Sequence, residues 1–210
     1  MQVGRVVNLK NCGKYFDFLR RNNVLIVLVV FFLFGLGLGI FSFKGFSDFK
    51  AAAQTYLESF VDLRTDSGFL KITVNSFLVS LTYIVLCFIV GSSALGIVVL
   101  PFVVALRGAV YGALMALLYS EYALKGIAFN AVMVLPAAAI FTAALILAAR
   151  ESVGFSLRVA RLTLPRTSPS NLYYDFKNYC GRYLVICLLV LVSALADGLI
   201  SRYFSDSFSL

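Results

Sequence analysis

Histidine and tryptophan are absent from this chain of 210 residues, and charged residues make up only 13% of it. Without histidine the chain lacks the commonest metal ligand and the commonest general base. Its four cysteines form no C-x-x-C pair, and no G-x-x-x-x-G-K-[ST] phosphate loop occurs. We therefore expect a protein that is not an enzyme and that needs no cofactor and no metal.

The scarcity of charge also excludes a water-soluble globule, because an average soluble domain has about 25% charged residues. Hydrophobic residues make up 61% of this chain, and its mean hydropathy is +0.93. Intrinsic disorder and a small disulfide-rich secreted domain are excluded as well. The net charge of +8 does not indicate nucleic-acid binding, because its distribution fits a membrane protein. We expect an all-α integral membrane protein with a single membrane domain over residues 1–210.

Five apolar stretches are long enough to cross a bilayer, which takes about 20 residues. The first exceeds the apolar part of a usual signal peptide, so we expect it to be a span. The sequence predicts a polytopic helical bundle of about five transmembrane helices over residues 23–43, 72–90, 97–118, 126–149 and 183–200.

Lysine and arginine are unevenly divided between the two sides of this predicted bundle. Five precede the first span and six lie between the fourth and the fifth, whereas the opposite side holds six in all. Basic residues in short loops stay in the cytoplasm. We therefore predict a multi-pass protein of the plasma membrane, with the N-terminus cytoplasmic and the C-terminus outside. The basic side would face the anionic inner leaflet, so membrane lipid is an expected partner.

The segment after the first span contains a predicted amphipathic extracytoplasmic helix over residues 47–63. Its apolar side either rests on the membrane or the bundle, or docks an extracytoplasmic partner. The residues of this predicted docking face are Phe49, Tyr56, Leu57 and Phe60.

Two further segments are expected to form short interfacial helices on the cytoplasmic side. Residues 153–164 have one apolar and one basic side, and Pro165 would end such a helix. Residues 91–101 are poor in helix formers and end at Pro101, so we expect a re-entrant or interfacial helix there in place of a simple tight turn.

Small residues recur at four-residue spacing in two spans, which lets helix backbones approach closely. Gly35 and Gly39 lie in the first span, and Gly108 and Gly112 lie in the third. These motifs either pack within the bundle or join two copies of the chain, so a homodimer is one of two open alternatives.

Polar residues inside the spans are expensive and are candidates for function. Arg107 either reaches toward the headgroups or is buried against a carboxylate or a helix end. Asp197, the one acid within a span, is expected near the opposite face, so a direct pair with Arg107 would need a deep water-filled cavity. Pro136 should bend the fourth span, and Asn130 lies six residues earlier near its outer end.

Several of these motifs occur together, in order, in one known family. They are the glycine-rich run 31–40, Gln54-x-Tyr56-Leu57-x-x-Phe60, Leu106-Arg107-Gly108-x-x-x-Gly112, Val134-Leu135-Pro136, and a carboxylate near the end of the last span, here Asp197. With this pattern over most of its length, the chain resembles the stage II sporulation protein M family of integral membrane proteins.

The resemblance implies a function that the residues alone do not. The family's namesake acts at the division septum and the engulfing membrane, as the anchor of a complex with the stage II sporulation proteins D and P. Those partners are peptidoglycan hydrolases: P is an amidase and endopeptidase, and D is a lytic transglycosylase. The implied function is a non-enzymatic scaffold that holds such enzymes at the membrane.

A permease-like subunit of a transporter, working with an ATPase, is the alternative. Arg107, Pro136 and the basic inner loop favour it. The odd number of predicted spans and the lack of a visible internal repeat count against it.

Overall fold

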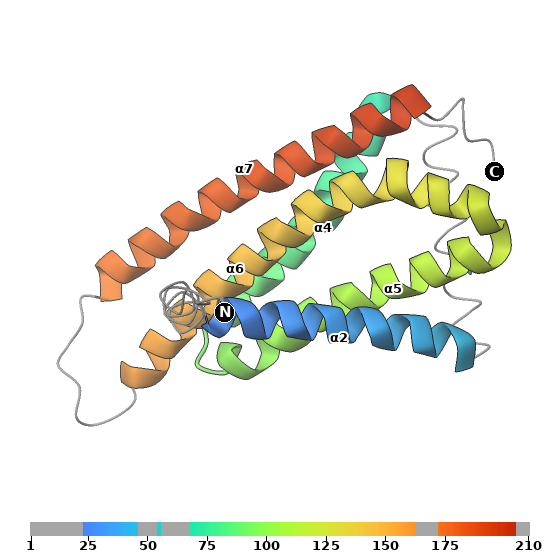
Figure 1. Cartoon of the computed structure of the whole chain (residues 1–210). Helices are drawn as coiled ribbons and strands as arrows, with labels where there is room; N and C mark the ends of the chain where they lie inside the picture. The colour runs from blue at the N-terminus through green and yellow to red at the C-terminus, as the bar shows by residue number, and fades with distance from the viewer. Residues whose placement is uncertain (1–22, 46–53, 56–67, 163–171, 205–210) are drawn as a thin grey trace, which may run out of the picture.

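The computed structural model describes residues 23–45, 54–55, 68–162 and 172–204. The regular elements in this part of the chain are all helical, as expected. In chain order they are α2 (Asn23–Gly45), α4 (Phe69–Gly91), α5 (Gly96–Phe129), the π-helix η1 (Asn130–Val134), α6 (Leu135–Leu162) and α7 (Leu172–Phe204). Figure 1 shows the long helices running roughly along one axis, with neighbours in the chain alternating in direction.

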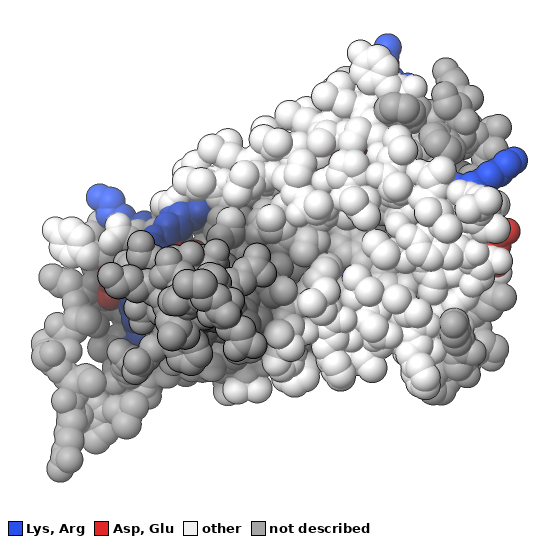
Figure 2. All heavy atoms as spheres, in the orientation of Figure 1, with Lys and Arg blue, Asp and Glu red and all other residues white. Residues whose placement is uncertain are grey.

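The described helices have the length and the surface of membrane spans. Four helical stretches are long and apolar enough to cross a bilayer: Asn23–Phe43, Phe69–Gly91, Gly96–Ala160 and Tyr173–Tyr203. Charged side chains gather at the two ends of the molecule in Figure 2, and the part of the surface between them that belongs to described residues is uncharged on the face shown. Large apolar side chains such as Phe34, Phe41 and Phe102 are exposed on the described helices. This surface suits contact with lipid.

The third of these stretches is not one straight helix. Its 65 residues would be about 98 Å long at 1.5 Å per residue, about three times the hydrocarbon thickness. Ala123 interrupts it with φ 43° and ψ −122°, and Figure 1 shows the chain turning back where α5 passes into α6. A Cβ added at Gly126 would lie 2.1 Å from the carbonyl oxygen of Leu118. The chain therefore reverses direction around Ala123, within the predicted gap between residues 118 and 126.

Helices α2 and α5 lie parallel and in backbone contact. A Cβ added at Gly39 would lie 2.1 Å from the Ala109 carbonyl oxygen, and one at Gly112 would lie 2.1 Å from the Leu36 carbonyl oxygen. The same close approach occurs one turn earlier in each helix, at Gly35 and Gly108. Both glycine motifs are thus used within one chain, and a dimer built on them would have to open this interface.

Residues 92–95 form a tight turn between α4 and α5, so the expected separate helix over 91–101 is wrong. The amide of Gly96 donates to the Ser93 carbonyl oxygen over 3.2 Å, and the Ser156 hydroxyl of α6 donates to the same oxygen over 2.7 Å. These bonds satisfy the backbone of the turn. Helix α5 can therefore start at Gly96 and continue through Pro101.

Helix α6 continues to Leu162, so the expectation of a separate interfacial helix from residue 153 is also wrong for the described residues. Helix α6 runs without interruption from Ala149 to Leu162. Val153 and Phe155 are buried, and Phe155 stacks on Tyr179 of α7 with ring centroids 4.6 Å apart. The apolar side of this segment faces protein, and packing on α7 prolongs the helix.

Candidate functional site

A cavity of about 100 Å³ lies between α4, α5, α6 and α7, and we call it the central cavity. On α4 its wall extends from Ile72, near the start of the helix, to Ser80, about 12 Å further along the helix axis at 1.5 Å per residue. Its polar lining residues include Asn75, Ser76, Ser80, Arg107, Ser193 and Asp197. The two residues of opposite charge that the sequence placed near opposite faces thus line one cavity.

Arg107 is held inside the bundle by aromatic side chains. Its side chain is 8% exposed, and its guanidinium carbon lies 4.8, 4.4 and 5.0 Å from the ring centroids of Tyr83, Tyr111 and Phe141. A guanidinium nitrogen also donates to the Tyr111 hydroxyl over 3.0 Å. Cation–π contacts of this kind are strongest where water is excluded. The side chain is therefore buried in the structure, but the contacts described above are with aromatic rings and a tyrosine hydroxyl, whereas a carboxylate or a helix end was expected from the sequence.

Asp197 of α7 lines the same cavity, on the side nearer the start of α4. It is 6% exposed and accepts a hydrogen bond from the Ser76 hydroxyl of α4. One turn further in on α7, the Ser193 hydroxyl donates to the Ala137 carbonyl oxygen of α6 over 2.8 Å. These two serines were not singled out from the sequence. One pattern in the sequence could have indicated them: hydroxyl residues four positions apart in an apolar span, such as Ser76 and Ser80, lie on the same face of the helix.

Asn130 and Pro136 lie at the bend that joins the returning chain to α6. Asn130 is buried, and its side-chain amide donates to the Tyr119 hydroxyl over 2.8 Å, across the reversal at Ala123. The π-helix Asn130–Val134 directly precedes Leu135 and Pro136. Proline has no amide hydrogen for the usual helical bond, and a π-turn is one way to absorb that loss. This bend brings Ala137 and Phe141 to the cavity wall.

A network of hydroxyl groups connects α4, α6 and α7. In the predicted topology it lies at the cytoplasmic end of the bundle. Ser152 of α6 is fully buried, and its hydroxyl lies 3.0 Å from the Cys87 carbonyl oxygen and 3.0 Å from the Tyr179 hydroxyl, and also bonds the Tyr183 hydroxyl. The two tyrosines in turn donate to carbonyl oxygens of Phe88 and Ala148, over 3.2 Å each. The carbonyls of Cys87 and Phe88 at the end of α4 thus gain additional partners from α6 and α7.

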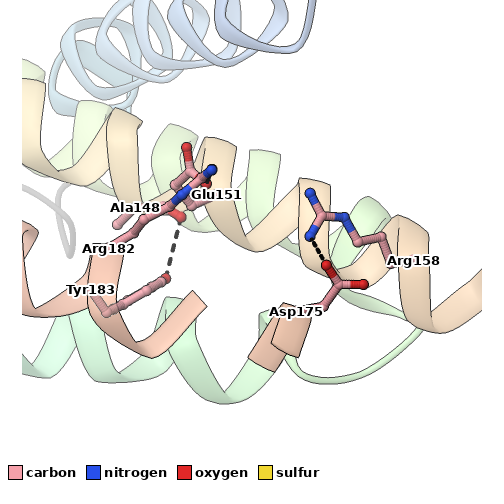
Figure 3. A network of polar contacts seen from close by, with 6 residues as sticks. All are labelled: Ala148, Glu151, Arg158, Asp175, Arg182 and Tyr183. Carbon is pink, nitrogen blue, oxygen red and sulfur yellow. Dashed lines mark hydrogen bonds and ion pairs between the residues drawn. The ribbon is translucent and has the colours of Figure 1, made fainter. Parts of the chain in front are cut away.

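Two ion pairs join α6 to α7 beside this network (Figure 3). Arg158 bonds Asp175 over 2.7 Å, and Arg182 bonds Glu151. Both arginines are about half exposed, so each pair contributes at most about 1 kcal/mol. No group of three His, Cys, Asp or Glu side chains in the described ranges is placed to hold a metal ion.

The predicted docking residues, Phe49, Tyr56, Leu57 and Phe60, lie outside the described residues. Within the predicted helix 47–63 only Gln54 and Thr55 are described, and both are helical. The side-chain amide of Gln54 donates to a carboxylate oxygen of Glu121 over 2.6 Å. Glu121 stands two residues before the reversal at Ala123. Gln54, in the chain between α2 and α4, is thus bonded to the tip of the α5–α6 hairpin.

The fold and the central cavity define a multi-pass α-helical membrane protein with charged groups held inside the bundle. The model of the family described as stage II sporulation protein M matches residues 28–202, and the chain belongs to that family. The family predicted from the sequence motifs is therefore confirmed. Comparison with curated proteins and with solved structures gave no match.

Proposed function

We propose that this protein is a non-enzymatic membrane scaffold that holds peptidoglycan-degrading enzymes at the septum and the engulfing membrane during sporulation. The observation that carries the proposal is the family match over residues 28–202, which spans the described helices from α2 to α7. The family is one of membrane proteins not known as enzymes. The proposed partners resemble the stage II sporulation proteins D and P. A chain without histidine that carries a large outer segment suits such a role.

The proposed topology has five crossings, with the N-terminus in the cytoplasm and the C-terminus outside. The reversal at Ala123 supports counting Gly96–Ala160 as two crossings. With five crossings, the ends of α6 and α7 that carry Arg150, Arg158, Lys177 and Arg182 lie on the side of the N-terminus. The bias of basic residues toward this end supports its cytoplasmic placement.

Cysteine labelling tests this topology. Two reporters, Lys125→Cys and Lys177→Cys, are made in a variant without the four native cysteines. A membrane-impermeant maleimide should label Lys125→Cys in intact cells stripped of their wall, and Lys177→Cys only after permeabilisation. Labelling of both reporters from one side would contradict the five-crossing arrangement.

The outer segment is the proposed docking site for the hydrolases. The bond from Gln54 to Glu121 supports a segment that stays beside the bundle, within reach of partners in the extracytoplasmic space. Its predicted apolar side, with Tyr56, Leu57 and Phe60, would provide the contact. Apolar and aromatic side chains are the usual anchors of protein interfaces.

Cross-linking of native membranes followed by mass spectrometry tests this docking role. The full-length protein should capture peptidoglycan hydrolases with extracytoplasmic domains. Replacing Tyr56, Leu57 and Phe60 by Asp should abolish the capture, whereas Lys50→Asp, on the polar side of the predicted helix, should not. If the triple variant folds and still recruits the hydrolases, this face is not the docking site.

A permease-like subunit is the second candidate, and the central cavity is the observation that favours it. The volume of about 100 Å³ is well below the roughly 300–1,000 Å³ of common small-molecule sites, so only a very small solute would fit. Under this hypothesis Arg107→Leu should abolish uptake by membrane vesicles, and a cytoplasmic ATPase should appear among the cross-linked partners. Full uptake by the variant would show that Arg107 is not part of the transport pathway.

A further inference from the structure

The central cavity carries opposite charges at different depths of the bundle. Asp197 is on the side nearer the start of α4, and Ser193, one turn further in, bonds the carbonyl oxygen of Ala137. Phe141 lies one more turn inward on α6. Its ring is one of the three that face the Arg107 guanidinium, with 5.0 Å between the guanidinium carbon and the ring centroid. Asp197 and Phe141, whose ring the Arg107 guanidinium covers, are therefore about two helical turns apart along the bundle axis.

The wall between these two charges can form hydrogen bonds, and the space is small. The hydroxyls of Ser76, Ser80 and Ser193 and the amide of Asn75 line it. The cavity volume of about 100 Å³ can be compared with an engineered cavity of roughly 150 Å³ that binds benzene. A small ligand that is polar at both ends would therefore suit this space.

We propose that the central cavity binds a small zwitterion, with a primary ammonium group toward Asp197 and a carboxylate toward Arg107. Glycine is the simplest molecule of this class. A lone anion would be repelled by Asp197, and a lone cation would be repelled by Arg107. In a medium of low dielectric constant these repulsions are large, and so are the two attractions that a zwitterion makes together. This binding site is independent of the scaffold function proposed above.

The surroundings of Arg107 prepare it for this role. The rings of Tyr83, Tyr111 and Phe141 lie within 5.0 Å of its guanidinium carbon, and the Tyr111 hydroxyl accepts one of its hydrogen bonds over 3.0 Å. A long side chain fixed in this way loses little further freedom when a ligand binds. A charge inside a membrane bundle is costly, which favours a functional role for it.

Binding to the purified full-length protein in detergent is the first test. Equilibrium dialysis with radiolabelled glycine should show saturable binding, and glycine should raise the midpoint of thermal unfolding. Acetate and methylammonium, which each carry one of the two charges, should leave the midpoint unchanged at the same concentration. Absence of glycine binding, or an equal shift with either single-charge compound, would overturn the proposal. This test needs no variant.

Substitution of the two charged residues is the second test. Arg107→Gln and Asp197→Asn should each weaken glycine binding about tenfold or more, the loss typical of a hydrogen bond to a charged group. Arg158→Gln and Asp175→Asn remove the charges of an ion pair outside the cavity and should leave the affinity unchanged. Full affinity for glycine in Arg107→Gln would overturn the proposal. If the cavity variants do not fold, the comparison of glycine, acetate and methylammonium on the unaltered protein decides.

The headgroup of phosphatidylethanolamine also joins a primary ammonium to an anionic group, so nanodiscs separate two sources of the ligand. A free zwitterion as the natural occupant predicts the same glycine affinity in phosphatidylglycerol discs and in discs that contain phosphatidylethanolamine. A lower affinity in the second disc type would support the zwitterion site and assign it to the lipid headgroup. Absence of glycine binding in both disc types would overturn the proposal.

Discussion

Gly39 of α2 lies directly against the carbonyl oxygen of Ala109 on α5, and a Cβ on Gly39 would come within 2.1 Å of that oxygen. Gly37, two residues earlier on α2, has nothing within 4 Å of the corresponding position. The two glycines are chemically identical and lie on the same helix, but only Gly39 faces the neighbouring backbone. The contact between α2 and α5 therefore depends on the absence of side chains at particular positions.

Gly39→Ala should destabilise the protein by about 1–3 kcal/mol, because the added methyl group pushes two backbones apart. Gly37→Ala adds the same methyl group in open space and should be neutral or stabilising by up to about 1 kcal/mol through helix propensity. Unfolding by sodium dodecyl sulfate in mixed micelles gives both values. Equal stability of the two variants would show that α2 does not depend on this contact.

The two glycine motifs were visible in the sequence, but their pairing was not. Spacing shows that Gly35 and Gly39 share a face, and that Gly108 and Gly112 do. It does not show which segments meet, because that depends on where α5 starts and on the register of helices more than 50 residues apart in the chain. Packing within the chain and packing between copies therefore had to stay open until the helices were placed.

The depth of Arg107 could not be predicted from the sequence for a related reason. The weak helix-forming residues from Gly91 to Gly96 were expected to prolong an interfacial segment, which would have left Arg107 near the headgroups. Ser156, which lies 63 residues after its bonding partner Ser93, caps this turn and lets α5 begin at Gly96. Arg107 is then about three turns inside the helix. A contact so distant in the sequence leaves no local signal.

Ser152→Ala should destabilise the protein by about 1 kcal/mol, because it removes a buried hydroxyl that contacts Cys87, Tyr179 and Tyr183. The loss is limited because both tyrosine hydroxyls keep a carbonyl acceptor. Thr82→Ala is the matched control: its hydroxyl is exposed and bonds the Leu78 carbonyl of its own helix over 2.9 Å, so little change is expected. The same micelle titration compares them, and a larger loss for Thr82→Ala would contradict the network.

Ala123→Gly should stabilise the protein by about 1 kcal/mol. Ala123 has a φ of 43°, a region in which a Cβ is strained and glycine is not. Its side chain is exposed, so removing the methyl group costs little packing. Ala128→Gly, at an exposed helical position five residues later, should instead cost about 1 kcal/mol. Thermal unfolding of both variants measures the difference, and a loss of stability in Ala123→Gly would show that the turn gains nothing from glycine.

Arg107 and Asp197 should be energetically coupled, because both are buried and line one cavity of low dielectric constant. Arg107→Gln and Asp197→Asn each remove one of the two opposite charges that line the cavity and should each destabilise the protein by about 3 kcal/mol. The double variant removes both charges, so its loss should be smaller than the sum by about 0.5–3 kcal/mol. Free energies of unfolding for the four proteins of this cycle, measured without added ligand, give the coupling. Strict additivity would mean that each charge is stabilised separately, Arg107 by its aromatic rings and Asp197 by Ser76, and that the cavity does not link them.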